Sequence, residues 1–230
     1  MTFTLVARCA RTGMLGVGTA TRAPAVGVRV PHVKPRLGAV AIMAMADERL
    51  GPLALRLLEI GYKAPGVIEQ MVVADPHAEQ RQLAVVDDDG FAAARTGSAN
   101  HDWCGHRCRD GYVVLGNALT GEHVIDAMEA AFLAIESEDL EERLMRAIEA
   151  GRDAGGQVGG QRSAALLVFD RKTFSRVDLR VDIHDEPVAE LRRVFDIYRP
   201  VIPYYDIRQV DPTVMSIDAW LAEHNPGQQW

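Results

Sequence analysis

The sequence lacks the features that mark secreted, membrane-spanning or nucleic-acid-binding proteins. Only three of its 230 residues are cysteines, Cys9, Cys104 and Cys108, a number too small and odd for a disulfide framework. No apolar stretch approaches the ~20 residues that a membrane-spanning helix needs. The 25 Lys and Arg residues form no long run and are outnumbered by 32 Asp and Glu. We therefore expect neither nucleic acid nor a membrane as a partner.

The start of the chain also lacks a targeting signal. Arg8 and Arg11 interrupt the first apolar run before it reaches the length of a signal peptide. With few thiols and no export signal, we expect a cytoplasmic protein. A chain of 230 residues fits one large domain, and no linker is polar and long enough to divide it. We therefore predict a single domain, 1–230, whose C-terminal tail, 198–230, ends in a short helix.

The apolar residues that are present follow strand patterns in several places. Residues 2–8 alternate polar and apolar side chains, and residues 14–21 form a second strand after Gly13. We expect the chain to begin directly with this hairpin. Residues 38–45 and 164–169 are apolar without alternation, which is typical of strands buried on both faces.

Helical periodicity fills the stretches between the strands, mostly in pairs of helices. The expected helices cover residues 47–61, 66–74, 121–135, 140–150, a stretch from 187 onward and 215–223. Strands and helix pairs in this order are typical of α+β proteins with antiparallel sheets. Strands buried on both faces require two packed sheets, so we predict a four-layer αββα sandwich with the helices outside.

Thr2 is a candidate nucleophile at the head of the first strand. If Met1 were removed, which a small second residue permits, the Thr2 hydroxyl could attack while its α-amine, with an ordinary pKa of ~8, takes the proton. While Met1 is attached, that amine is part of a peptide bond and cannot act as a base. Many soluble proteins have a small second residue without such a role, so the motif is weak on its own.

Two further polar residues follow strands that could lie near Thr2. Arg22 comes after the second strand, and a hairpin brings that end close to Thr2. A guanidinium there could lower the pKa of a terminal amine or hold a substrate carboxylate, although a solvated turn arginine is the common case. Asn117 ends an apolar strand, where its amide could donate to an oxyanion or cap the following helix.

A segment rich in Cys and His permits a metal-site hypothesis. In an extended strand Cys104, His106 and Cys108 would project from one side, close to His101. Such ligands could hold zinc with an open coordination position. The usual two-residue spacing between paired cysteines is missing, and a polar surface loop is the alternative.

The glycine-rich run at residues 155–160 has no phosphate-binding signature. It lacks the Gly-Lys-Ser/Thr ending, and a strand rather than a helix is expected after it. A flexible loop that could cover a pocket is the better interpretation. No motif in the sequence indicates a bound cofactor.

A set of motifs spread along the chain resembles the family called domain of unknown function 1028. The motifs are TFTLVAR at 2–8, QRQLAVVD at 80–87, TG at 96–97, GNAL at 116–119, SAALLV at 163–168, DLRVD at 178–182 and ELRR at 190–193. The family is grouped with the N-terminal-nucleophile (Ntn) hydrolases, which implies an αββα sandwich and hydrolysis of amide bonds. The resemblance further implies that Thr2 is the nucleophile and base, Arg22 the arginine beside it, and Asn117 an oxyanion or substrate contact.

Two stretches depart from the family pattern at expected pocket walls. The family has Thr-Gln-Ala where this chain has Met43-Ala44-Met45, and its glycine loop carries an acid and basic residues where this chain has Gln157 to Arg162. The implied activity is hydrolysis of a small amide, ureido or peptide-like compound. The alternative is a catalytically inactive small-molecule-binding or scaffold protein. Apolar outer helices and a Tyr204-Tyr205 tail favour a homodimer.

Overall fold

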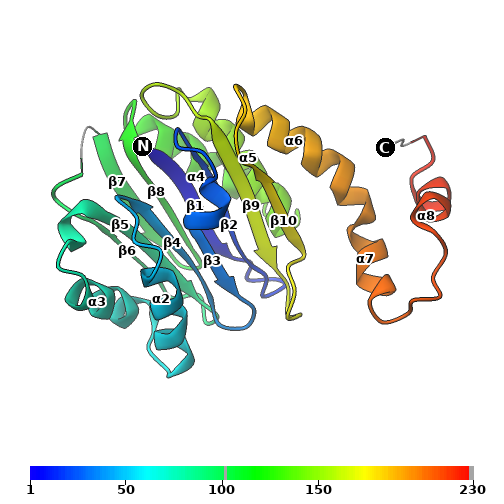
Figure 1. Ribbon diagram of the computed structural model, residues 1–230, viewed down its shortest axis with the longest axis horizontal. Helices are drawn as coiled ribbons and strands as arrows, with labels where there is room; N and C mark the ends of the chain where they lie inside the picture. Colours follow the sequence, from blue (N-terminus) through cyan, green and yellow to red (C-terminus); the bar gives the residue numbers. More distant parts are fainter. Residues whose placement is uncertain (101–102, 228–230) are drawn as a thin grey trace.

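The computed structural model describes residues 1–100 and 103–227, and in this part of the chain two antiparallel sheets pack face to face (Figure 1). The larger sheet has the strand order β10-β9-β2-β1-β8-β7. Its strands are β1 Thr2–Arg8, β2 Leu15–Thr21, β7 Trp103–Arg109, β8 Tyr112–Leu119, β9 Ser163–Phe169 and β10 Val177–Val181. The smaller sheet has the order β3-β4-β5-β6, with strands β3 Pro31–Lys34, β4 Gly38–Ala44, β5 Arg81–Asp87 and β6 Ala92–Thr96.

The longer helices cover the outer faces of the two sheets. The smaller sheet is covered by α2 Leu50–Glu59 and α3 Ala64–Ala74, and the larger sheet by α4 His123–Ala134, α5 Leu140–Asp153 and α6 Pro187–Tyr198. The shorter helices are α1 Val26–Arg29, η1 Ala78–Gln80, η2 Arg199–Val201, α7 Ile202–Arg208 and α8 Ile217–His224. The predicted α+β class, with two packed antiparallel sheets and helices outside, is confirmed.

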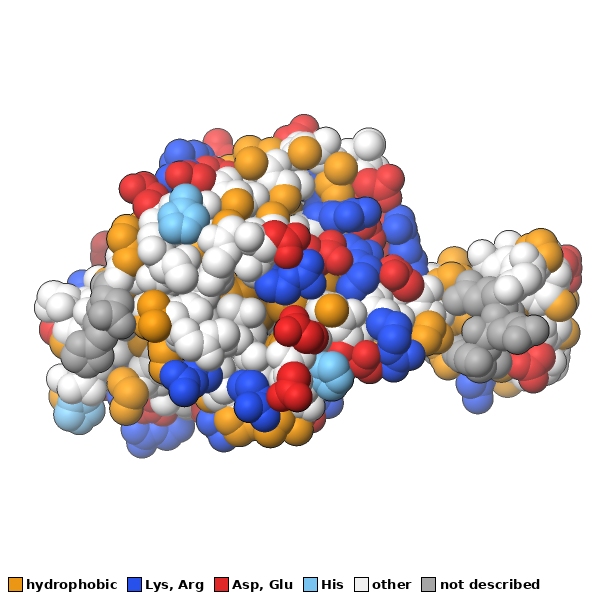
Figure 2. All heavy atoms as spheres, turned by 90° about the horizontal axis from the view of Figure 1, so that it is seen from above, with side chains coloured by type: hydrophobic (Ala, Val, Ile, Leu, Met, Phe, Trp, Pro, Cys, Tyr) orange, Lys and Arg blue, Asp and Glu red, His pale blue; other side chains and the backbone are white. Residues whose placement is uncertain are grey.

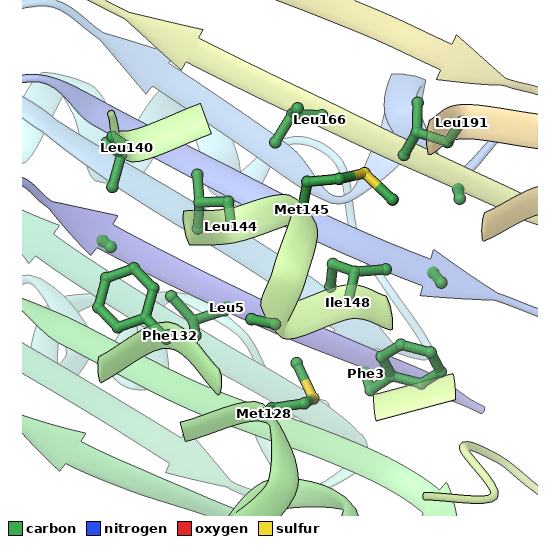
Figure 3. Packing of buried hydrophobic residues seen from close by; sticks show 14 of the residues in the cluster. Phe3, Leu5, Met128, Phe132, Leu140, Leu144, Met145, Ile148, Leu166 and Leu191 are labelled. Atoms are coloured by element: carbon green, nitrogen blue, oxygen red, sulfur yellow. The ribbon is translucent and has the colours of Figure 1, made fainter. Parts of the chain in front are cut away.

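Alternation along β1 assigns its side chains to two different apolar layers. Phe3 and Leu5 point toward α4 and α5, where they pack in a buried cluster with residues such as Phe132 (Figure 3). Val6 belongs to a second cluster, which lies between the two sheets. Since successive side chains of a strand point to opposite faces, Thr2 also faces the space between the sheets.

The polar segment around residue 105 forms a strand, although its side chains carry no strong strand signal. β7 lies at the edge of the larger sheet and pairs with β8, whose residues are all buried. Backbone pairing with a buried neighbour, rather than a hydrophobic pattern, places it in the sheet. The Pro-flanked residues 31–34 form edge strand β3, as expected for a segment with proline.

The last part of the C-terminal tail, with α8, stands away from the body of the molecule (Figures 1 and 2), whereas Ile202 and Asp206 in its first part contact the body. Its predicted helix is α8, and the tail also contains α7, which the sequence pattern did not predict. Tyr204 and Tyr205 pack within the tail, because Tyr204 lies against Trp220 and Tyr205 stacks on Tyr198. These tyrosines therefore give no support to the homodimer, which stays a prediction. No helix in residues 1–100 or 103–227 has the length and apolar character needed to cross a membrane.

Candidate active site

A row of polar side chains crosses the larger sheet at the end where β1 begins. Thr2 lies directly opposite Thr21 of β2 on one side and Asn117 of β8 on the other. Ser163 of β9 lies opposite Thr21. Cross-strand partners project from the same face of a sheet, and this face is the one turned toward the smaller sheet. The four polar side chains thus close one end of the apolar layer between the sheets.

The Thr2 hydroxyl is buried and hydrogen-bonded. Thr2 Oγ1 lies 3.0 Å from Thr21 Oγ1, and 6% of Thr2 is exposed. Thr21 Oγ1 donates to the carbonyl oxygen of Met1 at 2.5 Å. A threonine hydroxyl has only one proton to donate, so Thr2 is the donor and Thr21 the acceptor between the two hydroxyls. Loss of Met1 would release the Thr21 proton for another acceptor.

Asn117 is connected to the smaller sheet through Gln82 of β5. Asn117 Nδ2 donates to Gln82 Oε1 at 2.9 Å, and both side chains are buried. Gln82 Nε2 lies within hydrogen-bond distance of the carbonyl oxygens of Gly105 and Gly116 and of Thr96 Oγ1, at 3.0, 2.8 and 2.9 Å. Carbonyl oxygens only accept hydrogen bonds, which determines the orientation of the Gln82 amide. Asn117 must therefore present its NH₂ group to Gln82.

Neither Gln82 nor Thr21 was predicted as a site residue. The available signal for Gln82 is a polar side chain at the start of the otherwise apolar run 82–86. For Thr21 the signal is its position at the end of a hairpin that begins with Thr2.

Two cavities lie beside the polar row and share one wall. The first, of 490 Å³, is lined by Thr2, Thr21 and Arg22, and the second, of 620 Å³, is lined by Asn117 and Asn100. Both are also lined by Met1, Ala44 and Met45. The stretch 43–45, which departs from the family pattern, is therefore part of the cavity wall.

Arg22 lies on the rim of the first cavity with its side chain exposed. Within the part of the chain that the structure describes, no carboxylate pairs with its guanidinium. The Arg22 guanidinium also lies close to the glycine-rich loop at 155–160. A Cβ added at Gly159 would lie 2.6 Å from one of the guanidinium nitrogens. That loop is hydrogen-bonded to the end of β8, where Val158 N donates to Ala118 O at 3.0 Å.

Left-handed backbone conformations surround the cavities. Ala25, Ala44 and Ala118 have φ values of 58°, 66° and 52°. Ala44 lines both cavities, Ala118 the second, and the neighbours of Ala25 line the first. Such conformations strain residues other than glycine, and they cluster at functional sites.

Burial affects the α-amine at the chain start. It lowers the pKa of the Met1 amine below its ordinary value, because desolvation disfavours the charged form. After removal of Met1 the α-amine would be on Thr2, which lines the same cavity as Met1, and desolvation there would likewise favour the neutral base.

The three residues of the zinc hypothesis do not form a ligand cluster. Cys104, His106 and Cys108 all belong to β7, but a register shift between Trp103 and Gly105 interrupts its pairing with β8 at Cys104. His106 Nδ1 instead lies 2.9 Å from Thr96 Oγ1. Among the described residues no group of three His, Cys, Asp or Glu side chains could hold a metal ion. His101 lies outside the described residues.

Comparisons with known proteins identify the family. The model of the "Family of unknown function (DUF1028)" matches residues 2–191. A solved protein of Silicibacter pomeroyi from the same family model is 32% identical, with a TM-score of 0.79 over 86% of this chain and 88% of that one. Anbu (ancestral beta-subunit) from Yersinia bercovieri is 8% identical, with a TM-score of 0.44 over 94% and 99% of the chains, which is too low for us to infer anything from it. A search of curated proteins found no match. The chain therefore belongs to the family of unknown function DUF1028.

Proposed function

We propose that this protein is an amidohydrolase of the Ntn type, in which Thr2 becomes the nucleophile after removal of Met1. The observation that carries the proposal is the position of Thr2. It begins one of the two central strands of the larger sheet, lines a cavity, and lies directly opposite Asn117. The substrate would be a small amide, ureido or peptide-like compound.

The reaction would proceed through an ester on Thr2. Thr2 Oγ1 attacks the amide carbonyl carbon while the free α-amine of Thr2 takes the hydroxyl proton. The N–H of Asn117 that is not bonded to Gln82 donates to the developing oxyanion. The ammonium then gives its proton to the departing nitrogen as the C–N bond breaks. Water, deprotonated by the same amine, hydrolyses the ester and restores Thr2.

The experiment compares the same protein with a blocked and a free Thr2 amine. The chain is produced as a fusion to an N-terminal domain whose protease cuts directly before Thr2, and intact mass verifies the cut. Amidase activity toward a panel of small amides is measured before and after cleavage. We expect activity only after cleavage, because a peptide-bonded nitrogen cannot accept the proton.

Variants of Thr2 and its neighbour on the same face provide the controls. Thr2→Ala should abolish activity, and Thr2→Ser should keep part of it. Thr4→Val removes a buried hydroxyl two residues along the strand, where Thr4 Oγ1 lies 2.6 Å from Thr19 Oγ1, and it should leave activity nearly unchanged. Equal activity in the cleaved wild type and in Thr2→Ala would show that Thr2 is not the nucleophile.

The second candidate function is a catalytically inactive binding or scaffold protein. The observation that favours it is the apolar wall formed by Met43 and Ala44, where the family pattern has the polar residues Thr and Gln. Under this alternative the cleaved protein would bind small amides without turning them over. Binding that is identical in Thr2→Ala and wild type, with no product from either, would support it.

A further inference from the structure

The two cavities beside Thr2 differ in charge. Cationic side chains from three arginines line the first cavity, together with one carboxylate, that of Glu48. Arg29 pairs with Glu48 at 3.5 Å, and Arg81 pairs with Asp75 at 2.8 Å. Within the described part of the chain, this leaves the guanidinium of Arg22 as the uncompensated side-chain charge of the first cavity.

The second cavity carries no charged side chain among the described residues that line it. Among the residues that the structure describes there, the polar side chains are the amides of Gln80, Asn100 and Asn117, and the other side chains are apolar. A neutral group of moderate polarity fits such a wall, whereas a charged group would be desolvated there without a partner.

Met1 separates these two environments. It lines both cavities, and its carbonyl is held by Thr21. Thr2 lines the first cavity and Asn117 the second, although the two residues are direct cross-strand partners. A carbonyl that contacts both must therefore occupy the position of Met1, with one part of the substrate in each cavity.

From this geometry we infer that the substrate is an amide with a carboxylate on one side of the scissile bond and an uncharged group on the other. The inference rests on the proposed function. Arg22 binds the carboxylate in the first cavity, since a guanidinium matches a carboxylate with two parallel hydrogen bonds. The uncharged part lies in the second cavity, against Met45 and the amide of Asn100. Although the whole chain is acidic, with a net charge of −7, the rim of the first cavity carries a local excess of positive charge, which attracts anions.

Binding to an inactive protein tests the inference separately from catalysis. The Thr2→Ala chain, released from its fusion so that it begins at position 2, is titrated with two matched pairs of amides by calorimetry. One pair is hippurate and its neutral counterpart N-benzoylglycinamide. The other is succinanilate and its terminal amide, which place the carboxylate on the acyl side of the bond.

The expected result is that at least one carboxylate binds about tenfold or more tightly than its neutral counterpart. Adding Arg22→Gln should reduce that preference to less than about threefold. Adding Arg56→Gln, which changes an exposed arginine of α2 away from both cavities, should leave it intact. A preference that survives Arg22→Gln, or no binding of any of the four compounds at millimolar concentration, overturns the inference.

Turnover by the cleaved wild type then separates the two proposals. Equal turnover of neutral and carboxylate amides would support Thr2 as the nucleophile and contradict the inferred substrate class. If carboxylates bind preferentially through Arg22 but no amide is turned over, the inferred ligand class would be supported and the proposed hydrolase activity would be contradicted.

Discussion

Gln82 and Asn117 join the two sheets through a hydrogen bond of 2.9 Å, in which Asn117 Nδ2 donates to Gln82 Oε1. The bond crosses the layer between the sheets and is buried at both ends. Strand pairing places Asn117 opposite Thr2, but it does not determine how the carboxamide is turned. The partners of Gln82 determine that orientation, so one N–H of Asn117 is used and the other remains for a ligand.

Replacing Gln82 should therefore reduce catalysis through Asn117. In Gln82→Leu the Asn117 carboxamide loses its fixed orientation, and we expect kcat to fall by about 10- to 100-fold with a smaller change in KM. The free energy of unfolding should fall by about 1–3 kcal/mol, because buried carbonyl groups lose their donor. Steady-state kinetics and urea unfolding measure the two effects.

A double-mutant cycle distinguishes this positioning role from general destabilisation. In an Asn117→Ala background, Gln82→Leu should cost almost nothing further in kcat, while its effect on unfolding persists. Independent losses of kcat from the two substitutions would show that Gln82 does not act through Asn117.

The pH dependence of kcat/KM should report the Thr2 amine. The base must be neutral, so activity is present above the amine pKa and is lost as pH falls through it. Burial already lowers the pKa of the Met1 amine, and a Thr2 amine would lie beside the same cavity, which Arg22 also lines, so we expect the midpoint below the ordinary value of ~8. Arg22→Gln removes a nearby cation and should move the midpoint upward. A midpoint that stays at or above 8 in the wild type contradicts the assignment.

Much of the fold could be predicted because its strongest signals are local. The alternation of residues 2–8 and the uninterrupted apolar run at 38–45 both predict strands, and β1 and β4 lie where these patterns place them. Both strands are buried on both faces. The sequence signal for β7 is weaker, since its place in the sheet depends on backbone pairing with β8 rather than on its own side chains. The short helix α7 likewise begins in a segment whose two prolines obscure the pattern.

The candidate site was predictable only in part. A hairpin that starts at Thr2 brings Thr21 and hence Arg22 to the same end of the sheet, and the structure pairs Thr2 with Thr21. The contact between Asn117 and Gln82 joins residues 35 positions apart on different sheets. No local pattern encodes such a contact, because it depends on how the sheets are packed.

Gly159 should control the position of Arg22. Its φ of +80° is strained for any other residue, and an added Cβ would lie 2.6 Å from the Arg22 guanidinium. Gly159→Ala should displace that side chain and weaken binding of carboxylate amides about as much as Arg22→Gln does. Gly160→Ala is the matched control, because its φ is +75° but nothing lies near the added Cβ. Equal effects of the two variants on binding would mean that loop strain, rather than Arg22, is responsible.

Thr21 should assist the nucleophile once Met1 has left. Its proton, which is held by the Met1 carbonyl at 2.5 Å, then becomes available to Thr2 Oγ1 or to the substrate. Thr21→Val keeps the volume and removes the hydroxyl, and we expect kcat to fall about tenfold, the effect of one lost hydrogen bond of about 1.4 kcal/mol. Thr19→Val is the control. Thr19 lies on the same strand and face as Thr21, and the substitution removes the hydroxyl that is hydrogen-bonded to Thr4. Both variants leave one buried hydroxyl without its partner and should lose similar stability. If Thr19→Val reduces kcat as much as Thr21→Val, the effect comes from the sheet as a whole and Thr21 has no special role.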